Sequence, residues 1–176
     1  MPQWLVITLI VIAGIIGLWL LLLVINLIFV GSFNAIFKRH KKAIVVILYT
    51  KLENMKKLLS ILNQNGVKHD AKISNTLYNI NSNDFNEPGS EEFDKSKKAL
   101  SYVKDEIMFI TNENQELNQD PEFITYRNNV NDADTQYRNN VIMYNADVLG
   151  YNYWIRFLPC RFIFKMFKVK RKEIIS

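Results

Sequence analysis

The sequence predicts an all-α protein in which an N-terminal transmembrane helix is followed by an antiparallel three- to four-helix bundle or coiled-coil-like domain. Three observations lead to this prediction. No residue from 4 to 37 is charged, and apolar residues further along recur at spacings of three and four, the heptad pattern of packed helices. The β-branched run at 44–47 has no second strand candidate to pair with, so helix is favoured there too.

The uncharged stretch is long enough to be a membrane anchor. About thirty-four residues in helical rise reach about 50 Å, against a hydrocarbon core of about 30 Å. Its apolar run is interrupted by Thr8, Asn26, Ser32 and Asn34, and the spanning part is expected over residues 4–30. A cleaved secretory signal is the alternative, but such a signal has a shorter apolar core that follows basic residues, and no basic residue precedes this run.

The charges beside the anchor predict its orientation. Lys38, Arg39, Lys41 and Lys42 follow the span and no Lys or Arg precedes it. By the positive-inside rule, the chain is a single-pass plasma-membrane protein with its N-terminus outside and most of its length in the cytoplasm. We expect three parts: an anchor over 1–32, a helical bundle over 33–150 and a C-terminal tail over 151–176.

The helices of the bundle are expected at about 33–65, 90–118 and 121–150, with a loop and a short helix over 66–89. Gly66 ends the first heptad stripe, Ser90 is the expected N-cap of the second helix, and Asp120 before Pro121 is the expected start of the third. Lys51 is assigned to the solvated face of the first helix, and Asn114 is either a buried register residue or a wet end of the seam. The core seam is expected at Leu52, Leu59, Leu100, Val103, Ile107, Ile110, Tyr137, Val141, Tyr144 and Val148.

The tail interleaves aromatic and basic residues, seven Lys or Arg against one acid. This pattern fits a segment in a lipid headgroup layer, a C-terminal helix on its own bundle, or a single-stranded nucleic-acid surface. The anchor favours lipid, since each cation near an anionic leaflet contributes about 1 kcal/mol. The tail reaches that membrane only if the third helix runs back toward it. The expected membrane-interface residues are Lys38, Arg39, Lys41, Lys42, Trp154, Arg156, Phe157, Arg161, Phe162, Lys165, Phe167 and Lys168.

Both ends of the chain resemble the LemA family. The residues 33–36, Phe-Asn-Ala-Ile, are similar to the family's Tyr-Asn-x-Leu after its membrane helix. The C-terminal signature is represented by Ala133, Tyr137, Val141, Tyr144, Asn145 and Val148, then Phe157-Leu158-Pro159, Phe162 and Phe167. The chain is thus identified as a divergent member. The resemblance implies a bacterial protein with an N-terminal membrane helix, a cytoplasmic antiparallel helical bundle and no established enzymatic activity.

No catalytic constellation, metal-ligand spacing or glycine-rich phosphate loop is recognised, so no catalytic residue, metal or cofactor is expected. The single cysteine, Cys160, excludes an internal disulfide and is either a small buried side chain or a reactive or lipid-modified thiol. We expect a membrane-anchored, non-enzymatic helical scaffold or interaction protein. Its expected partners are the lipid bilayer, a second copy or a membrane protein, and not nucleic acid. The alternatives are a regulatory accessory subunit of a membrane enzyme such as a protease, and a small membrane-perturbing protein.

Overall fold

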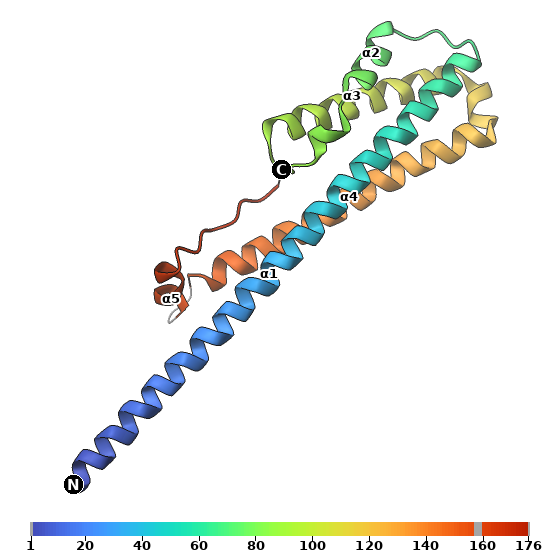
Figure 1. The fold of residues 1–176 in the computed structure, drawn as a ribbon. Helices are drawn as coiled ribbons and strands as arrows, with labels where there is room; N and C mark the ends of the chain where they lie inside the picture. The colour runs from blue at the N-terminus through green and yellow to red at the C-terminus, as the bar shows by residue number, and fades with distance from the viewer. Residues whose placement is uncertain (1, 157–159, 176) are drawn as a thin grey trace. The chain divides into compact units, whose positions relative to one another are not determined.

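The computed structural model describes residues 2–156 and 160–175, and all of the secondary structure in these ranges is helical (Figure 1). This confirms the all-α prediction for the described chain. In order, the elements are α1 (Gln3–Gln64), α2 (Ala71–Asn79), the 3₁₀ helix η1 (Ser82–Phe85), α3 (Glu91–Glu113), the 3₁₀ helix η2 (Gln115–Gln119), α4 (Pro121–Trp154) and α5 (Cys160–Met166).

Helix α1 is a single element in which the uncharged segment and the first heptad stripe are continuous. The helix expected to begin near residue 33 therefore has no start of its own. At 1.5 Å per residue α1 is about 90 Å long, and near its N-terminus it is long and apolar enough to cross a membrane. Thr8 and Ser32 each donate a hydroxyl hydrogen bond to the carbonyl four residues earlier, at 2.8 and 2.9 Å, so neither hydroxyl needs another partner.

The contacts divide the chain into two compact units, and each unit combines early and late parts of the sequence. Unit 1 consists of Met1–Lys38 and Ala146–Glu173, and unit 2 consists of Arg39–Asn145 and Ile174–Ser176. Both α1 and α4 contribute one part to each unit.

In unit 2 the first heptad stripe is part of the buried core. Leu52, Met55 and Leu59 are completely buried, and Leu48 and Leu62 are nearly so. Gly66 then ends α1, because it adopts a φ of +67° that side-chain-bearing residues rarely take. The amide of Val67 donates to the carbonyl of Leu62, the longer bond of a Schellman cap.

The connection from α1 to α3 is ordered by local caps. Asp70 accepts a hydrogen bond from the amide of Lys72 at 2.8 Å and so starts α2. Asn81 and Asp84 form a capping box around η1, and the Asp84 carboxylate also accepts from the Ser96 hydroxyl at 2.7 Å, which fixes η1 to α3. Phe85 and Phe93 pack edge to face beneath this connection.

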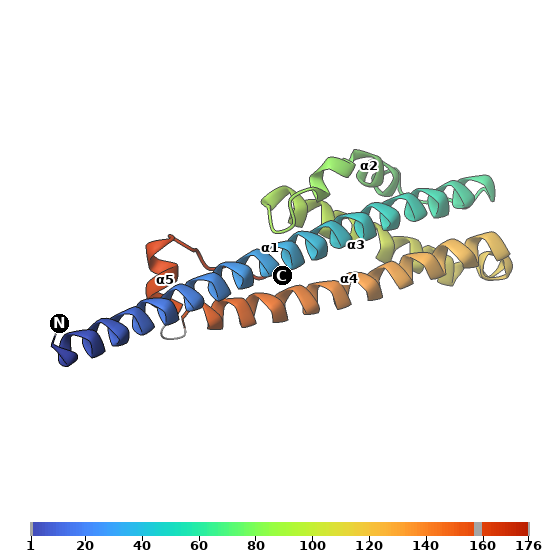
Figure 2. The same cartoon turned by 60° about the horizontal axis from the view of Figure 1, so that its bottom comes forward.

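Helices α3 and α4 both begin at the predicted caps. Ser90 accepts from the Phe93 amide at 3.1 Å, and Asp120 accepts from the Glu122 amide at 2.8 Å. The chain turns at η2, and within unit 2 α4 runs back along α3 and along the second half of α1, which share one direction (Figures 1 and 2). The pairs that join these helices agree with this course, since Lys51 and Lys104 both reach Asp134 while Lys41 lies over Tyr144.

Two expectations for polar residues need revision. Lys51 was expected on the solvated face, but it is only 4% exposed because α3 and α4 cover that side of α1. Asn114 lies neither within the seam nor simply in solvent, because it is the half-buried C-cap of α3 and its side chain donates to the Ile110 carbonyl at 2.8 Å. Helix α3 therefore ends at Glu113, short of the predicted end near residue 118, and Leu117 is buried from η2.

We expect the change Leu59→Ala or Leu100→Ala to lower the free energy of unfolding by about 2–5 kcal/mol, because each leaves a cavity in the core of unit 2. Ile142→Ala, at an exposed position of α4, is the matched control and should change it by less than about 0.5 kcal/mol. Urea unfolding followed by circular dichroism in mild detergent measures all three. Equal effects at the buried and exposed positions would contradict this core.

Candidate functional site

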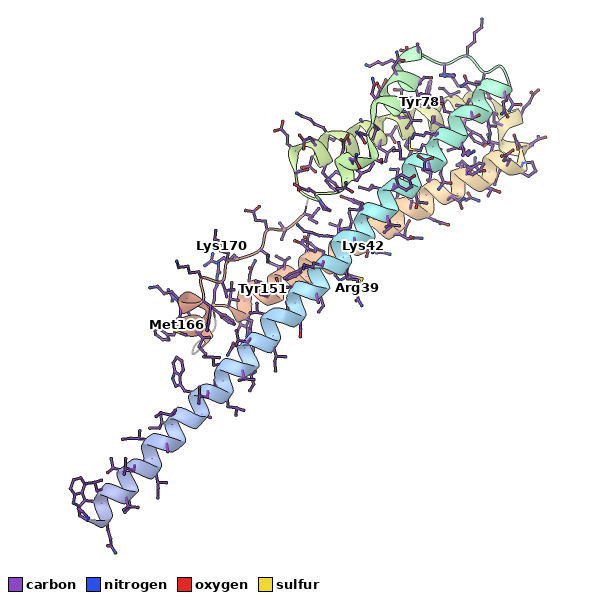
Figure 3. The ribbon with its side chains drawn as sticks, in the orientation of Figure 1. Arg39, Lys42, Tyr78, Tyr151, Met166 and Lys170 are labelled. Carbon is purple, nitrogen blue, oxygen red and sulfur yellow. The ribbon has the colours of Figure 1, made fainter. Side chains whose placement is uncertain are left out.

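The expected interface residues that follow the apolar segment lie on α1, and the side chains of Arg39 and Lys42 point away from the neighbouring helices (Figure 3). Lys38 belongs to unit 1, and Arg39, Lys41 and Lys42 belong to unit 2. Three of the four are exposed, and Lys41 is half-buried with its ammonium 6.0 Å from the centre of the Tyr144 ring. The basic charge is therefore available to an anionic surface on this part of α1.

Within unit 1, five aromatic rings form a continuous cluster between α1 and the end of α4. Phe29 lies 4.5 Å from Phe33 and 4.6 Å from Trp154, measured between ring centroids. Tyr151 lies 5.8 Å from Phe33 and 5.4 Å from Phe37, meeting the second ring edge to face. Successive α1 rings are four residues apart and so share one helix face. Tyr and Trp are enriched where protein crosses a membrane interface, and the two rings that α4 contributes to this cluster are of these types.

The cluster continues into the apolar segment through a buried hydrogen bond. The indole Nε1–H of Trp154 donates to Oδ1 of Asn26 at 3.2 Å, and the Asn26 amide group donates to the Leu22 carbonyl at 2.7 Å. Asn26 is only 1% exposed. Both polar ends of its side chain are thus satisfied, and α4 ends beside the last turns of the segment expected to span the bilayer.

The expected interface residues of the tail that the structure describes are Trp154, Arg156, Arg161, Phe162, Lys165, Phe167 and Lys168. Apart from Trp154, which is half-buried in the aromatic cluster, all of these are exposed. In α5, Ile163 and Phe164 face inward while Phe162 is 66% exposed, and Met166 is also exposed (Figure 3). Apolar and cationic side chains on the same short surface are typical of segments at a lipid headgroup layer. Phe157 lies outside the described residues, as does the side chain of Cys160.

Two asparagines of α4 hold the chain that follows α5. In unit 1, Asn152 exchanges two hydrogen bonds with the backbone of Lys172, at 2.9 and 3.0 Å. In unit 2, Asn145 makes the same pair with Ile175, at 2.8 and 2.9 Å. Asn145 and Asn152 are seven residues apart, two helical turns, so both amides leave one face of α4. Neither role was anticipated from the sequence, although Asn145 belongs to the motif that resembles LemA.

Most of the expected core seam is buried. Leu52, Leu59, Leu100, Val103, Ile107 and Val148 have no exposure, Tyr144 and Ile110 are buried with slight exposure, and Tyr137 and Val141 are half-buried.

A charge cluster that was not predicted from the sequence lies between the three helices of unit 2. The Asp134 carboxylate of α4 receives Lys51 of α1 on one oxygen and Lys104 of α3 on the other, both at 2.5 Å. Burial lowers the pKa of the Lys51 ammonium. The hydrogen bond from Lys51 to Asp134, a carboxylate that also accepts from Lys104, does not offset this effect. Burial alone would raise the pKa of Asp134, but hydrogen bonds from Lys104 and Lys51 outweigh it and hold that pKa below its ordinary value.

No group of three or more His, Cys, Asp or Glu side chains able to hold a metal ion occurs among the residues that the structure describes. Comparisons of the chain with protein-family models, curated proteins and solved structures give no match. The resemblance to the LemA family therefore stays a prediction that rests on the motifs alone.

We expect Trp154→Phe to lower the free energy of unfolding by roughly 1–3 kcal/mol, because it leaves the buried Asn26 oxygen without its donor. In the Asn26→Leu background the same change should cost much less. A thermal-unfolding double-mutant cycle in detergent measures this coupling, with Trp19→Phe at an exposed position as control. Equal losses in both backgrounds would show that the hydrogen bond does not hold α4 to α1.

For the charge cluster, we expect Asp134→Asn to be more disruptive than Lys51→Met. Asp134→Asn leaves two lysines facing each other and should lower the free energy of unfolding by roughly 2–4 kcal/mol, the lower figures reflecting partial exposure of Asp134. Lys51→Met leaves Asp134 paired with Lys104 and should change it by less than about 1 kcal/mol.

The pH dependence of unfolding tests the same cluster. Because the pKa of Lys51 is lowered from 10.5 in the folded chain, folding releases a proton, and stability should rise with pH up to that value. The pKa of Asp134 is lowered, so its contribution should be lost as pH falls below its ordinary value of 3.8. Burial raises the pKa of Tyr137 to about 12, so this residue opposes the rise in stability at alkaline pH, in the wild type and in Lys51→Met alike. The difference between wild type and Lys51→Met removes that background. A difference independent of pH would contradict the assignment of Lys51.

Proposed function

We propose that the chain is a membrane-anchored, non-enzymatic helical scaffold or interaction protein at the cytoplasmic face of a bacterial plasma membrane, similar to LemA. In this proposal α1 crosses the bilayer once, with its N-terminus outside. Its second half, α3 and α4 form a three-helix bundle in the cytoplasm, in which α4 runs antiparallel to the other two helices.

The observation that carries the proposal is the exposure of the apolar half of α1. None of the most apolar eighteen-residue window of this helix is buried by the described chain. Ile10, Leu18 and Ile28, for example, are 60–65% exposed. A continuous apolar surface of this extent marks contact with lipid or with another protein. A helix satisfies its own backbone hydrogen bonds, so lipid can surround it at no cost in unpaired backbone groups.

The aromatic cluster of unit 1 supports placing the interface near residues 29–37. Its α1 rings begin with Phe29 in the last turn of the proposed span and continue beyond it to Phe37, and the basic residues 38–42 follow directly. The indole of Trp154 reaches Asn26 on the other side of the cluster, which supports a tail returning to the same leaflet. The exposed cations of α5 and its flanks would then lie against anionic headgroups.

An interaction role is supported by apolar side chains that the described chain leaves uncovered in unit 2. Val46 and Tyr49 of α1 and Ile142 and Met143 of α4 are all about half exposed or more. Such side chains favour a protein partner, either a second copy or a membrane protein. Catalysis is left out of the proposal because the sequence contains no recognised catalytic motif.

Cysteine labelling tests the anchor and its orientation. In a Cys160→Ser background, Gln3→Cys should react with a membrane-impermeant maleimide in intact cells, and Lys57→Cys only in inverted vesicles. Both positions are exposed in the structure, so a failure to react reports the membrane barrier and not burial. Labelling of Lys57→Cys in intact cells, or recovery of a soluble chain that lacks the apolar segment, would overturn the proposal.

A further inference from the structure

A cavity of about 650 Å³ lies in unit 2 among α1, α3 and α4. It is within the usual range for small-molecule sites, roughly 300–1,000 Å³. Because all three helices contribute to its lining, the residues around it come from distant parts of the sequence. Its shape is therefore set by the packing of this unit.

The lining of the cavity is strongly cationic. It contains five basic side chains, Lys51, Lys97, Lys98, Lys104 and Arg138, and two acidic ones, Asp105 and Asp134. Lys51 and Lys104 share the carboxylate of Asp134, Asp105 also interacts electrostatically with Lys51, and Lys97 pairs with Asp94 at 3.4 Å, so five basic side chains face three acidic ones. The cavity wall thus carries a surplus of positive charge in a partly desolvated place, where an anion is attracted more strongly than in water.

The donors around the cavity suit a tetrahedral anion. Lysine ammoniums act as point charges with three donors each, and the Arg138 guanidinium can donate two parallel bonds to one oxyanion. The Tyr137 hydroxyl oxygen is buried with no hydrogen-bond partner among the described residues, and its ring lies 6.0 Å from the Lys97 ammonium. An oxyanion near Tyr137 would give that hydroxyl an acceptor.

The cavity also offers one aromatic surface. Leu48 and Leu100 line it from α1 and α3, but they are only 2% and 0% exposed, so they leave almost no surface for a ligand. Tyr102 lines it with an exposed ring, and the Lys72 ammonium lies 5.3 Å from the centre of that ring. Phosphate alone would not use this ring, whereas an organic group attached to the phosphate would.

We propose that this cavity binds the phosphate group of a small phosphorylated molecule, with Lys98, Lys104 and Arg138 holding the phosphate and the Tyr102 ring contacting the organic part. Because Asp134 pairs with the buried Lys51 as well as with Lys104, its single negative charge cannot neutralise both lysines. This raises the affinity of the cavity for the phosphate. This site is independent of the proposed membrane function, and nothing in the proposed anchor is needed for it.

Isothermal titration of the full chain in mild detergent with pyrophosphate tests the proposal. The double variant Lys98→Gln, Arg138→Gln should bind pyrophosphate roughly tenfold more weakly, because it loses charge-assisted hydrogen bonds to the phosphate oxygens. Lys57→Gln, Lys95→Gln is the matched control, since it removes the same charge from exposed positions that do not line the cavity. Both variants keep the basic tail, so non-specific binding there is common to both.

Full affinity in the control with weakened binding in the cavity variant supports the site. Absence of binding to the wild type, or equal losses in the two variants, would overturn it. Circular dichroism confirms that each variant is folded, which is expected because all four positions are exposed.

Vesicles containing phosphatidic acid form a second arm of the experiment. Competition between these vesicles and pyrophosphate would identify lipid phosphate as the source, and its absence together with pyrophosphate binding would identify a soluble ligand.

Discussion

The fold depends on a single uninterrupted ladder of backbone hydrogen bonds, the one that runs through α1 from Gln3 to Gln64. This helix changes from uncharged and largely apolar to amphipathic along its length, and it stays α-helical throughout. Every later element that packs on α1 therefore contacts one of two kinds of surface. The first half of α1 presents phenylalanine rings and the buried Asn26 amide. The second half presents a heptad stripe with the Lys51 ammonium beside it. The end of α4 matches the first with Tyr151 and Trp154, and Asp134 matches the second.

Within unit 2 the shared carboxylate of Asp134 sets the register of three helices at once. A hydrophobic seam tolerates sliding by a heptad, since one leucine replaces another. A buried charge does not, because a slip would separate Lys51 or Lys104 from its counter-ion. The net stabilisation of such a cluster is small, since burial opposes the charge on Lys51. Its contribution is specificity, and the same surplus of positive charge makes the adjoining cavity suitable for an anion.

The local elements were predictable where a residue acts on its own neighbours. Ser90 and Asp120 cap their helices and Gly66 ends α1, because each effect is complete within one turn of chain. Lys51 was misplaced since an amphipathic pattern assigns every charge to solvent, and its partner lies 83 residues away. The hydrogen bonds of Asn145 and Asn152 to the backbone of the tail were not predicted for a related reason. A side-chain amide that pairs with extended backbone produces no periodic pattern in the sequence.

The polar residues of the first helix divide it into a generic part and a specific part. Thr8 is satisfied by the carbonyl of its own preceding turn, and an added Cβ at Gly14 or Gly17 would meet nothing within 4 Å. Thr8 and these two glycines thus encode no particular neighbour. The opening turns are free to drift among apolar residues over evolutionary time, while Asn26 and the three phenylalanines that follow must change together with the end of α4.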